Sequence, residues 1–103
     1  MQSLITTQKP KISEICKRYN VRKLELFGSA VTENGFNEAQ SDFDFAVEFL
    51  KPRKLKPLDE FFGLKSELTE LLGRPIDLVE LSAVKNPYIL KSIEDAKETV
   101  FAA

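Results

Sequence analysis

Apolar residues recur along the chain at two spacings, one typical of helices and one typical of strands. From Ile12 to Tyr19 the spacing is helical, which predicts a helix over residues 9–19. Pro10 suits the first turn of that helix, and Asn20 is a plausible terminator. The helical stripe includes Cys16, which we therefore expect to fill space in the core.

Two strands are predicted next, over residues 21–27 and 42–49, separated by Gly28-Ser29 and a turn-like stretch near Gly35. The second strand alternates most clearly. One face carries Asp42, Asp44, Ala46 and Glu48, and the other carries Phe43, Phe45, Val47 and Phe49.

In the second half of the chain, the spacing of apolar residues predicts a helix with a wide apolar stripe over 58–72, which Gly73 ends. A third strand is predicted over 75–81. Asn86-Pro87 then reads as the cap and first turn of a helix that runs to about residue 97, followed by a short edge strand over 99–101. This order predicts an α/β (α+β) fold, a small mixed β-sheet flanked by helices, within one domain of residues 1–103.

Charge and composition exclude several classes of function. The 103 residues carry 15 basic and 16 acidic side chains, which argues against strong nucleic-acid binding because that requires a basic face. The sequence has no histidine, so Ser-His and Cys-His catalysis and histidine metal sites are excluded. Chemistry must then depend on carboxylates, lysines, arginines, hydroxyls or backbone groups.

Cellular location is indicated only weakly. A single cysteine allows no internal disulfide and fits a reducing cytoplasm. No apolar run approaches the roughly 20 residues that span a bilayer, and the N-terminus lacks the pattern of a secretory signal. We therefore expect a cytoplasmic protein without membrane contact.

Three aspartates are the candidate chemical groups. Asp42 and Asp44 point to the same side of one strand, with Cα atoms roughly 6 to 7 Å apart. Side by side, two carboxylates repel each other, and a divalent cation such as Mg²⁺ or Mn²⁺ turns that repulsion into attraction. Asp77 lies in an apolar strand that reads as buried, where a carboxylate needs a partner, either a metal cluster or a cation such as Arg74. A solvated polar face on an edge strand is the bland alternative for Asp42 and Asp44.

Gly28-Ser29 closes the first strand, where backbone N–H groups and a hydroxyl could bind phosphate if a helix begins there. By itself this dipeptide is most often a turn. The order is more specific: Leu26-Phe27-Gly28-Ser29, then Asp42-Phe43-Asp44, then Asp77. It resembles the nucleotidyltransferase superfamily related to DNA polymerase beta, and within it the minimal nucleotidyltransferases, often antitoxins of toxin–antitoxin pairs.

The resemblance implies a polymerase beta-like nucleotidyltransferase fold and a role for each residue. Gly28 and Ser29 would hold the β and γ phosphates of a nucleoside triphosphate. Asp42, Asp44 and Asp77 would be the catalytic carboxylates and the metal ligands, with Asp77 helping to deprotonate the attacking hydroxyl. A two-metal site of this kind requires no histidine.

One departure concerns the segment after Gly28-Ser29, where such proteins usually carry Ala-Arg-Gly. Here Thr32 stands at the arginine position and Glu33 follows it. A cation near a triphosphate would offset charge. Other basic residues could replace it only if the fold brings them near, namely Lys51, Arg53, Lys54 and Lys85.

The resemblance implies a metal-dependent enzyme that moves AMP from ATP to a hydroxyl of a partner protein, a HEPN-domain toxin. The first alternative is an antitoxin that masks its partner by contact alone, with a weakened site. The second is an unrelated α/β domain whose aspartates are structural. A chain of this length leaves acceptor recognition to a partner or to self-association as a homo-oligomer.

Overall fold

The computed structural model describes residues 3–27, 43–52, 55–95 and 97–103. Its centre is a four-stranded mixed sheet in the order β3-β2-β1-β4. The strands are β1 (Val21–Phe27), β2 (Phe43–Phe49), β3 (Ile76–Glu80) and β4 (Lys97–Ala102). β1 runs antiparallel to both β2 and β4, whereas β2 and β3 are parallel. The predicted mixed sheet is confirmed.

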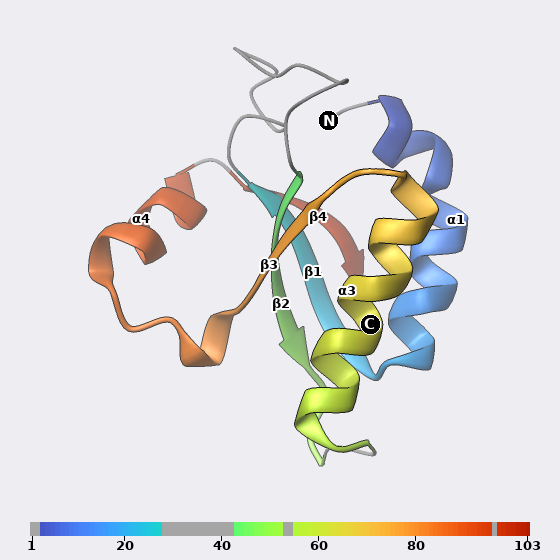
Figure 1. Ribbon diagram of the computed structural model, residues 1–103. Coiled ribbons are helices and arrows are strands. Elements are labelled where there is room, and N and C mark those ends of the chain that lie inside the picture. The colour runs from blue at the N-terminus through green and yellow to red at the C-terminus, as the bar shows by residue number, and fades with distance from the viewer. Residues whose placement is uncertain (1–2, 28–42, 53–54, 96) are drawn as a thin grey trace.

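Two long helices cover one face of this sheet (Figure 1). They are α1 (Ser3–Arg18) and α3 (Pro57–Leu72). The short 3-10 helix η1 (Leu81–Ala83) follows β3, and α4 (Pro87–Asp95) lies on the other side of the sheet. We call the sheet surface opposite α1 and α3 the open face, although Ala46 and Glu25 on it are buried.

The main core lies between the sheet and the pair α1 and α3. The alternation in β2 decides which side chains enter it, because Phe43, Phe45 and Val47 are almost completely buried. The buried stripe of α1 includes Ile12 and Cys16, so the predicted core role of Cys16 is confirmed. Burying these apolar side chains is the principal force that orients the sheet against the helices.

Helix α1 is longer than predicted. It begins at Ser3 rather than residue 9, which places Pro10 inside the helix instead of in its first turn. Proline removes one backbone hydrogen bond of a helix interior, so the continuation requires compensation from packing. Ile5, which precedes Pro10, is completely buried in the main core and supplies such packing.

The N-terminal half of α3 also differs from the prediction of a wide buried stripe. Leu58 is 70% exposed and Phe62 is 57% exposed, although Phe61 packs against the main core. The two rings meet edge to face, with centroids 5.2 Å apart. The apolar stripe predicted for this helix therefore packs against the core at Phe61 and is exposed to solvent at Phe62.

Predicted helix boundaries are confirmed at three places. Asn20 ends α1 with a φ of 63°, a left-handed conformation that asparagine tolerates. Gly73 ends α3 with a φ of 65°, and its N–H donates to the carbonyl oxygen of Thr69 at 2.9 Å. Asn86 caps α4, because its Oδ1 accepts a 2.9 Å hydrogen bond from the backbone N–H of Tyr88.

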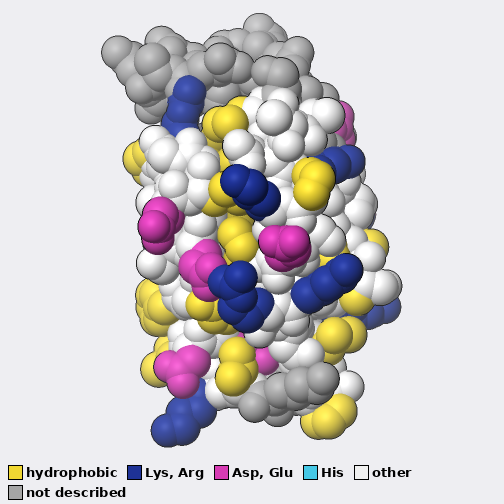
Figure 2. Space-filling view, turned by 90° about the vertical axis from the view of Figure 1, so that its right-hand side faces the viewer, with side chains coloured by type: hydrophobic (Ala, Val, Ile, Leu, Met, Phe, Trp, Pro, Cys, Tyr) yellow, Lys and Arg dark blue, Asp and Glu magenta, His cyan; other side chains and the backbone are white. Residues whose placement is uncertain are grey.

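The helix-covered side of the molecule shows basic and acidic side chains interspersed among hydrophobic ones (Figure 2). An ion pair between Arg18 of α1 and Glu67 of α3 is part of this pattern. This view therefore presents no basic surface of a single sign. Among the described residues, no helix is both long and apolar enough to cross a membrane.

Candidate functional site

Asp44 and Asp77 lie directly opposite each other on the neighbouring strands β2 and β3. Residues paired in this way share a face of the sheet and have backbones about 5 Å apart. That face is the open face, since the residues before and after Asp44 are buried under α1 and α3. The structure therefore brings together two of the three predicted carboxylates.

The apolar neighbours of these aspartates determine the pairing. Phe43 and Phe45 on β2 lie opposite Ile76 and Leu78 on β3, and all four side chains are buried in the main core. A slip of one residue would move these side chains out of the core. The start of the pairing is held further by the guanidinium of Arg74, which lies 5.8 Å from the centre of the Phe43 ring.

Exposure corrects one expectation. Asp77 was predicted in a strand that is buried throughout, yet its side chain is exposed, and Asp44 is half-buried. The reason is that β3 packs against helices on one side only, so Ile76 and Leu78 are buried while Asp77 faces away from them. Asp77 therefore needs no buried partner and is accessible to a ligand.

The row that begins with Asp77 and Asp44 continues across all four strands. Phe27 at the end of β1 lies opposite Asp44, and Lys97 at the start of β4 lies opposite Phe27. The next residues after Phe27 in the chain are Gly28 and Ser29. We call Asp77, Asp44, Phe27 and Lys97 the cross-sheet row.

The remaining predicted site residues, Gly28, Ser29 and Asp42, lie outside the described residues. Within the described ranges, no three acidic, histidine or cysteine side chains gather as a metal-binding group. Asp44 and Asp77 therefore form a pair in this part of the chain, and Asp42 is separated from Asp44 by only one residue of sequence. Carboxylate oxygens are the ligands that Mg²⁺ and Mn²⁺ prefer, so this pair has suitable chemistry for a divalent cation.

A buried carboxylate, Glu25, lies on the same face and was not singled out from the sequence. Its side chain is only 3% exposed and lies between two lysines, with Lys23 Nζ at 3.4 Å and Lys97 Nζ at 3.6 Å. Thr99 also donates a 3.4 Å hydrogen bond to it. The alternation along β1 was a usable signal, because it places Glu25 on the same side as Phe27.

Lys97 was predicted at the end of the last helix but begins β4 instead. Its Nζ donates a 3.2 Å hydrogen bond to Glu94, the main cause of its raised pKa, and the negative charge of Glu25 contributes further. Pairing with β1 supplies backbone hydrogen bonds to Lys97 that outweigh the helical pattern preceding it.

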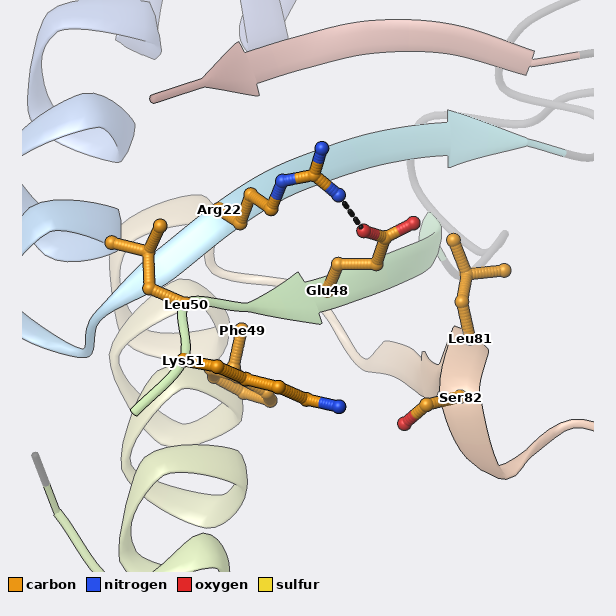
Figure 3. A pocket seen from close by; sticks show the side chains of 7 residues that line it. All are labelled: Arg22, Glu48, Phe49, Leu50, Lys51, Leu81 and Ser82. Atoms are coloured by element: carbon orange, nitrogen blue, oxygen red, sulfur yellow. Dashed lines mark hydrogen bonds and ion pairs between the residues drawn. The ribbon is translucent and has the colours of Figure 1, made fainter. Parts of the chain in front are cut away.

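A hollow opens at the opposite end of β2 from Asp44, with a volume of about 570 Å³ (Figure 3). Arg22 and Glu48 form a 2.7 Å ion pair beside it, and its lining residues are Arg22, Glu48, Phe49, Leu50, Lys51, Leu81 and Ser82. The run from Asp44 to Phe49 alone separates the two ends by roughly 16 Å. Lys51 is therefore remote from the carboxylate pair and does not replace the missing arginine, while Arg53 and Lys54 lie outside the described residues.

The chain is similar in sequence to named proteins of one organism. A relative from Methanocaldococcus jannaschii, named as a candidate protein adenylyltransferase, is 42% identical over 80 residues, which are 77% of this chain and 76% of the relative. A second such protein from the same organism is 34% identical over 79 residues, with 77% of this chain and 76% of the relative covered.

Solved structures share the fold. The solved structure of a candidate minimal nucleotidyltransferase superposes on this chain with a TM-score of 0.71 at 24% identity. The superposition covers 94% of this chain and 95% of that one. A toxin–antitoxin complex with AMP-PNP gives 0.69 at 20% identity, covering 92% and 73%. A tri-AMPylated HEPN toxin in complex with a minimal nucleotidyltransferase antitoxin from Shewanella oneidensis gives 0.66 at 18% identity, covering 96% and 73%.

The profile of the polymerase beta nucleotidyltransferase family matches residues 10–103. That span includes the whole cross-sheet row as well as the segment that carries Gly28, Ser29 and Asp42. The chain therefore belongs to the polymerase beta nucleotidyltransferase family.

Proposed function

We propose that this nucleotidyltransferase transfers AMP from ATP to a hydroxyl group of a partner protein. The observation that carries the proposal is the direct opposition of Asp44 and Asp77 on the open face, next to the strand end that leads into Gly28-Ser29. The names of the sequence relatives support a protein acceptor. We place the activity in the cytoplasm.

The reaction is a substitution at the α-phosphorus of ATP. The hydroxyl oxygen of the acceptor forms a bond to that phosphorus, the bond to the β-phosphate oxygen breaks, and pyrophosphate leaves. Asp77 receives the hydroxyl proton, a role that its exposure permits. Gly28 and Ser29 hold the β and γ phosphates through backbone N–H groups and a hydroxyl.

The carboxylates Asp42, Asp44 and Asp77 would hold Mg²⁺ or Mn²⁺. Bound there, the cation would neutralise phosphate charge and stabilise the attacking and leaving oxygens. Asp44 and Asp77 fit this use because they lie opposite each other on one face of the sheet. Two carboxylates on neighbouring strands offer the oxygen ligands that Mg²⁺ and Mn²⁺ prefer.

We propose a HEPN-domain toxin as the acceptor and an antitoxin role for this chain. The Shewanella oneidensis complex supports this assignment, because it joins an AMPylated HEPN toxin to a protein of the same fold. A non-catalytic antitoxin that masks its partner is the second candidate. It is favoured by the absence of any lysine or arginine between Gly28 and Asp42.

The test is intact-mass measurement of a HEPN-domain toxin from the same genome after incubation with this protein, Mg²⁺ and each nucleoside triphosphate. We expect the toxin to gain one or more AMP groups with ATP. The variant carrying Asp44→Asn and Asp77→Asn should give no gain, and Asp59→Asn, which replaces an exposed aspartate of α3, should behave as wild type.

Two outcomes separate the candidates. Toxin of unchanged mass that is nevertheless neutralised, by wild type and by the double variant alike, would replace the enzymatic proposal with the masking one. A mass gain that persists in the double variant would remove Asp44 and Asp77 from the catalytic site.

A further inference from the structure

The sequence around the candidate site residues is rich in negative charge. The segment from Gly28 to Asp42 contains Glu33 and Glu38 and has no basic residue. Asp44 and Asp77 add two more carboxylates. A triphosphate bound here would bring further negative charge, which divalent cations neutralise only in part. The site therefore needs a basic side chain from elsewhere in the fold.

Lys97 is the described basic residue that occupies the cross-sheet row. It lies opposite Phe27, the residue that leads into Gly28-Ser29, and two strands away from Asp44, a backbone separation of about 10 Å. Its side chain is on the open face, as its contact with Glu25 shows, and is 29% exposed. Lysine carries its charge on a flexible four-carbon stem, so the ammonium group can move toward the strand end.

Other described basic residues are less well placed. Lys23 shares the open face but precedes Phe27 by four positions, which is about 13 Å along the strand. Arg22 and Lys51 line the hollow at the far end of β2. Arg74 lies at the correct end of the sheet, but its guanidinium covers the ring of Phe43, whose side chain belongs to the main core beneath the helices.

We propose that Lys97 binds the terminal phosphates of the nucleotide and supplies the positive charge that the segment after Gly28-Ser29 lacks. This inference rests on the proposed function, because it assigns a further nucleotide-binding residue to the same site. Without nucleotide, the Nζ of Lys97 forms ion pairs with Glu25 and Glu94.

The contacts of Glu25 make this exchange feasible. Glu25 is buried, so it would be left unpaired if Lys97 were its only cation. Lys23 Nζ remains 3.4 Å from Glu25, and Thr99 still donates a hydrogen bond. Lys97 can therefore turn to a phosphate, a stronger acceptor with more charge than one carboxylate, while Glu25 stays compensated.

The experiment is calorimetric titration of the purified protein with AMP-PNP and, separately, with AMP, both in Mg²⁺. Lys97→Met should weaken AMP-PNP binding about tenfold or more, the usual effect of losing a hydrogen bond between charged groups. The affinity for AMP should stay within about twofold, because AMP lacks the terminal phosphates. Lys97→Arg should retain most of the AMP-PNP affinity.

Two further variants control for charge and folding. Lys17→Met removes the same charge from α1, on the helix-covered side, and should leave both affinities unchanged. Lys97→Met combined with Glu25→Gln removes the buried carboxylate together with its lysine. This double variant should fold as stably as wild type, measured by thermal melting, yet still bind AMP-PNP as weakly as Lys97→Met.

The possible results separate the role of Lys97 from the proposed function. Wild-type AMP-PNP affinity in Lys97→Met would overturn the role of Lys97 and leave the proposed function intact. Equal losses for AMP and AMP-PNP would also overturn it, since they indicate a structural effect. A wild-type protein that binds neither nucleotide in Mg²⁺ would overturn the proposed function itself.

Discussion

Asp44 of β2 and Asp77 of β3 face each other across a parallel pair of strands, although 33 positions separate them in the sequence. The parallel pairing requires the chain to leave the sheet after β2, form α3 and return at the same end. Helix α3 therefore does more than cover the core. It brings Asp77 beside the strand that holds Asp44.

The opposition of Asp44 and Asp77 predicts that both residues contribute to the binding of Mg²⁺ with ATP. Replacing Asp44 and Asp77 together by asparagine removes two candidate metal ligands from the same face of the sheet. Millimolar Mg²⁺ with ATP should raise the melting temperature of wild type and not that of the double variant. Asp59→Asn should keep the wild-type response, and an equal ligand response in all three proteins would contradict the assignment.

The sequence was sufficient to place Asp44 and Asp77 on strands but not to pair those strands. The alternation from Phe43 to Phe49 assigns Asp44 to the face away from the core, and the structure confirms it. The Asp44–Asp77 register depends on long-range packing of β3 beside β2, which no local pattern encodes. The exposure of Asp77 was mispredicted for the same reason, because apolar neighbours alone do not reveal that one face of β3 is open.

Two local misassignments have specific physical causes. Pro10 was placed in the first turn of its helix because it usually stops a helix, yet burial of Ile5 extends α1 beyond it. Lys97 was assigned to the last helix because helical spacing continues up to it, yet pairing with β1 makes it a strand residue. The second difference matters more, because it brings Lys97 into the cross-sheet row.

Asn20 joins the end of α1 to Glu60 of α3 and to Leu50 after β2. We predict that its side-chain hydrogen bonds and its backbone conformation contribute separately to stability. Its side-chain amide donates a 3.3 Å hydrogen bond to the buried Glu60, and its backbone carbonyl accepts one from Leu50. Asn20→Ala should lower the free energy of unfolding by about 3 kcal/mol, through the loss of its side-chain hydrogen bonds to Glu60 and to the carbonyl oxygen of Leu50 and through the strain of alanine at positive φ. Asn20→Gly should lose about 1 kcal/mol less, because glycine tolerates that φ.

Urea unfolding of the two variants provides the measurement. Asn20→Asp is the informative control, because aspartate also tolerates positive φ but places a second carboxylate against Glu60. It should be less stable than Asn20→Gly. Equal stabilities of the alanine and glycine variants would show that no backbone strain is involved at this position.

Gly63 of α3 lies under the ring of Tyr19, which predicts an unusual result for a helix glycine. A Cβ at position 63 would lie 2.9 Å from Cζ of Tyr19 and still closer to Cε1. Alanine normally favours a helix by about 1 kcal/mol over glycine. Here Gly63→Ala should instead destabilise the protein by about 1 to 2 kcal/mol, because the ring must move.

The same substitution made in a Tyr19→Ala background should become stabilising, since the obstructing ring is gone. Urea unfolding of wild type, both single variants and the double variant gives the coupling energy between the two positions. A coupling near zero would mean that the Tyr19 ring moves aside without loss.

Burial of Cys16 predicts a loss of stability in alkali. Removal from water raises the thiol pKa to about 12 from an ordinary value of 9.0. The unfolded thiol ionises first, so this contribution is complete below pH 9 and is lost progressively between pH 9 and about 12. Cys16→Ala should lower stability at pH 8 by about 1 kcal/mol through the small cavity that it leaves. Urea unfolding under reducing conditions should show the difference shrinking and then reversing above pH 10, whereas parallel curves would mean that the buried thiol does not resist ionisation.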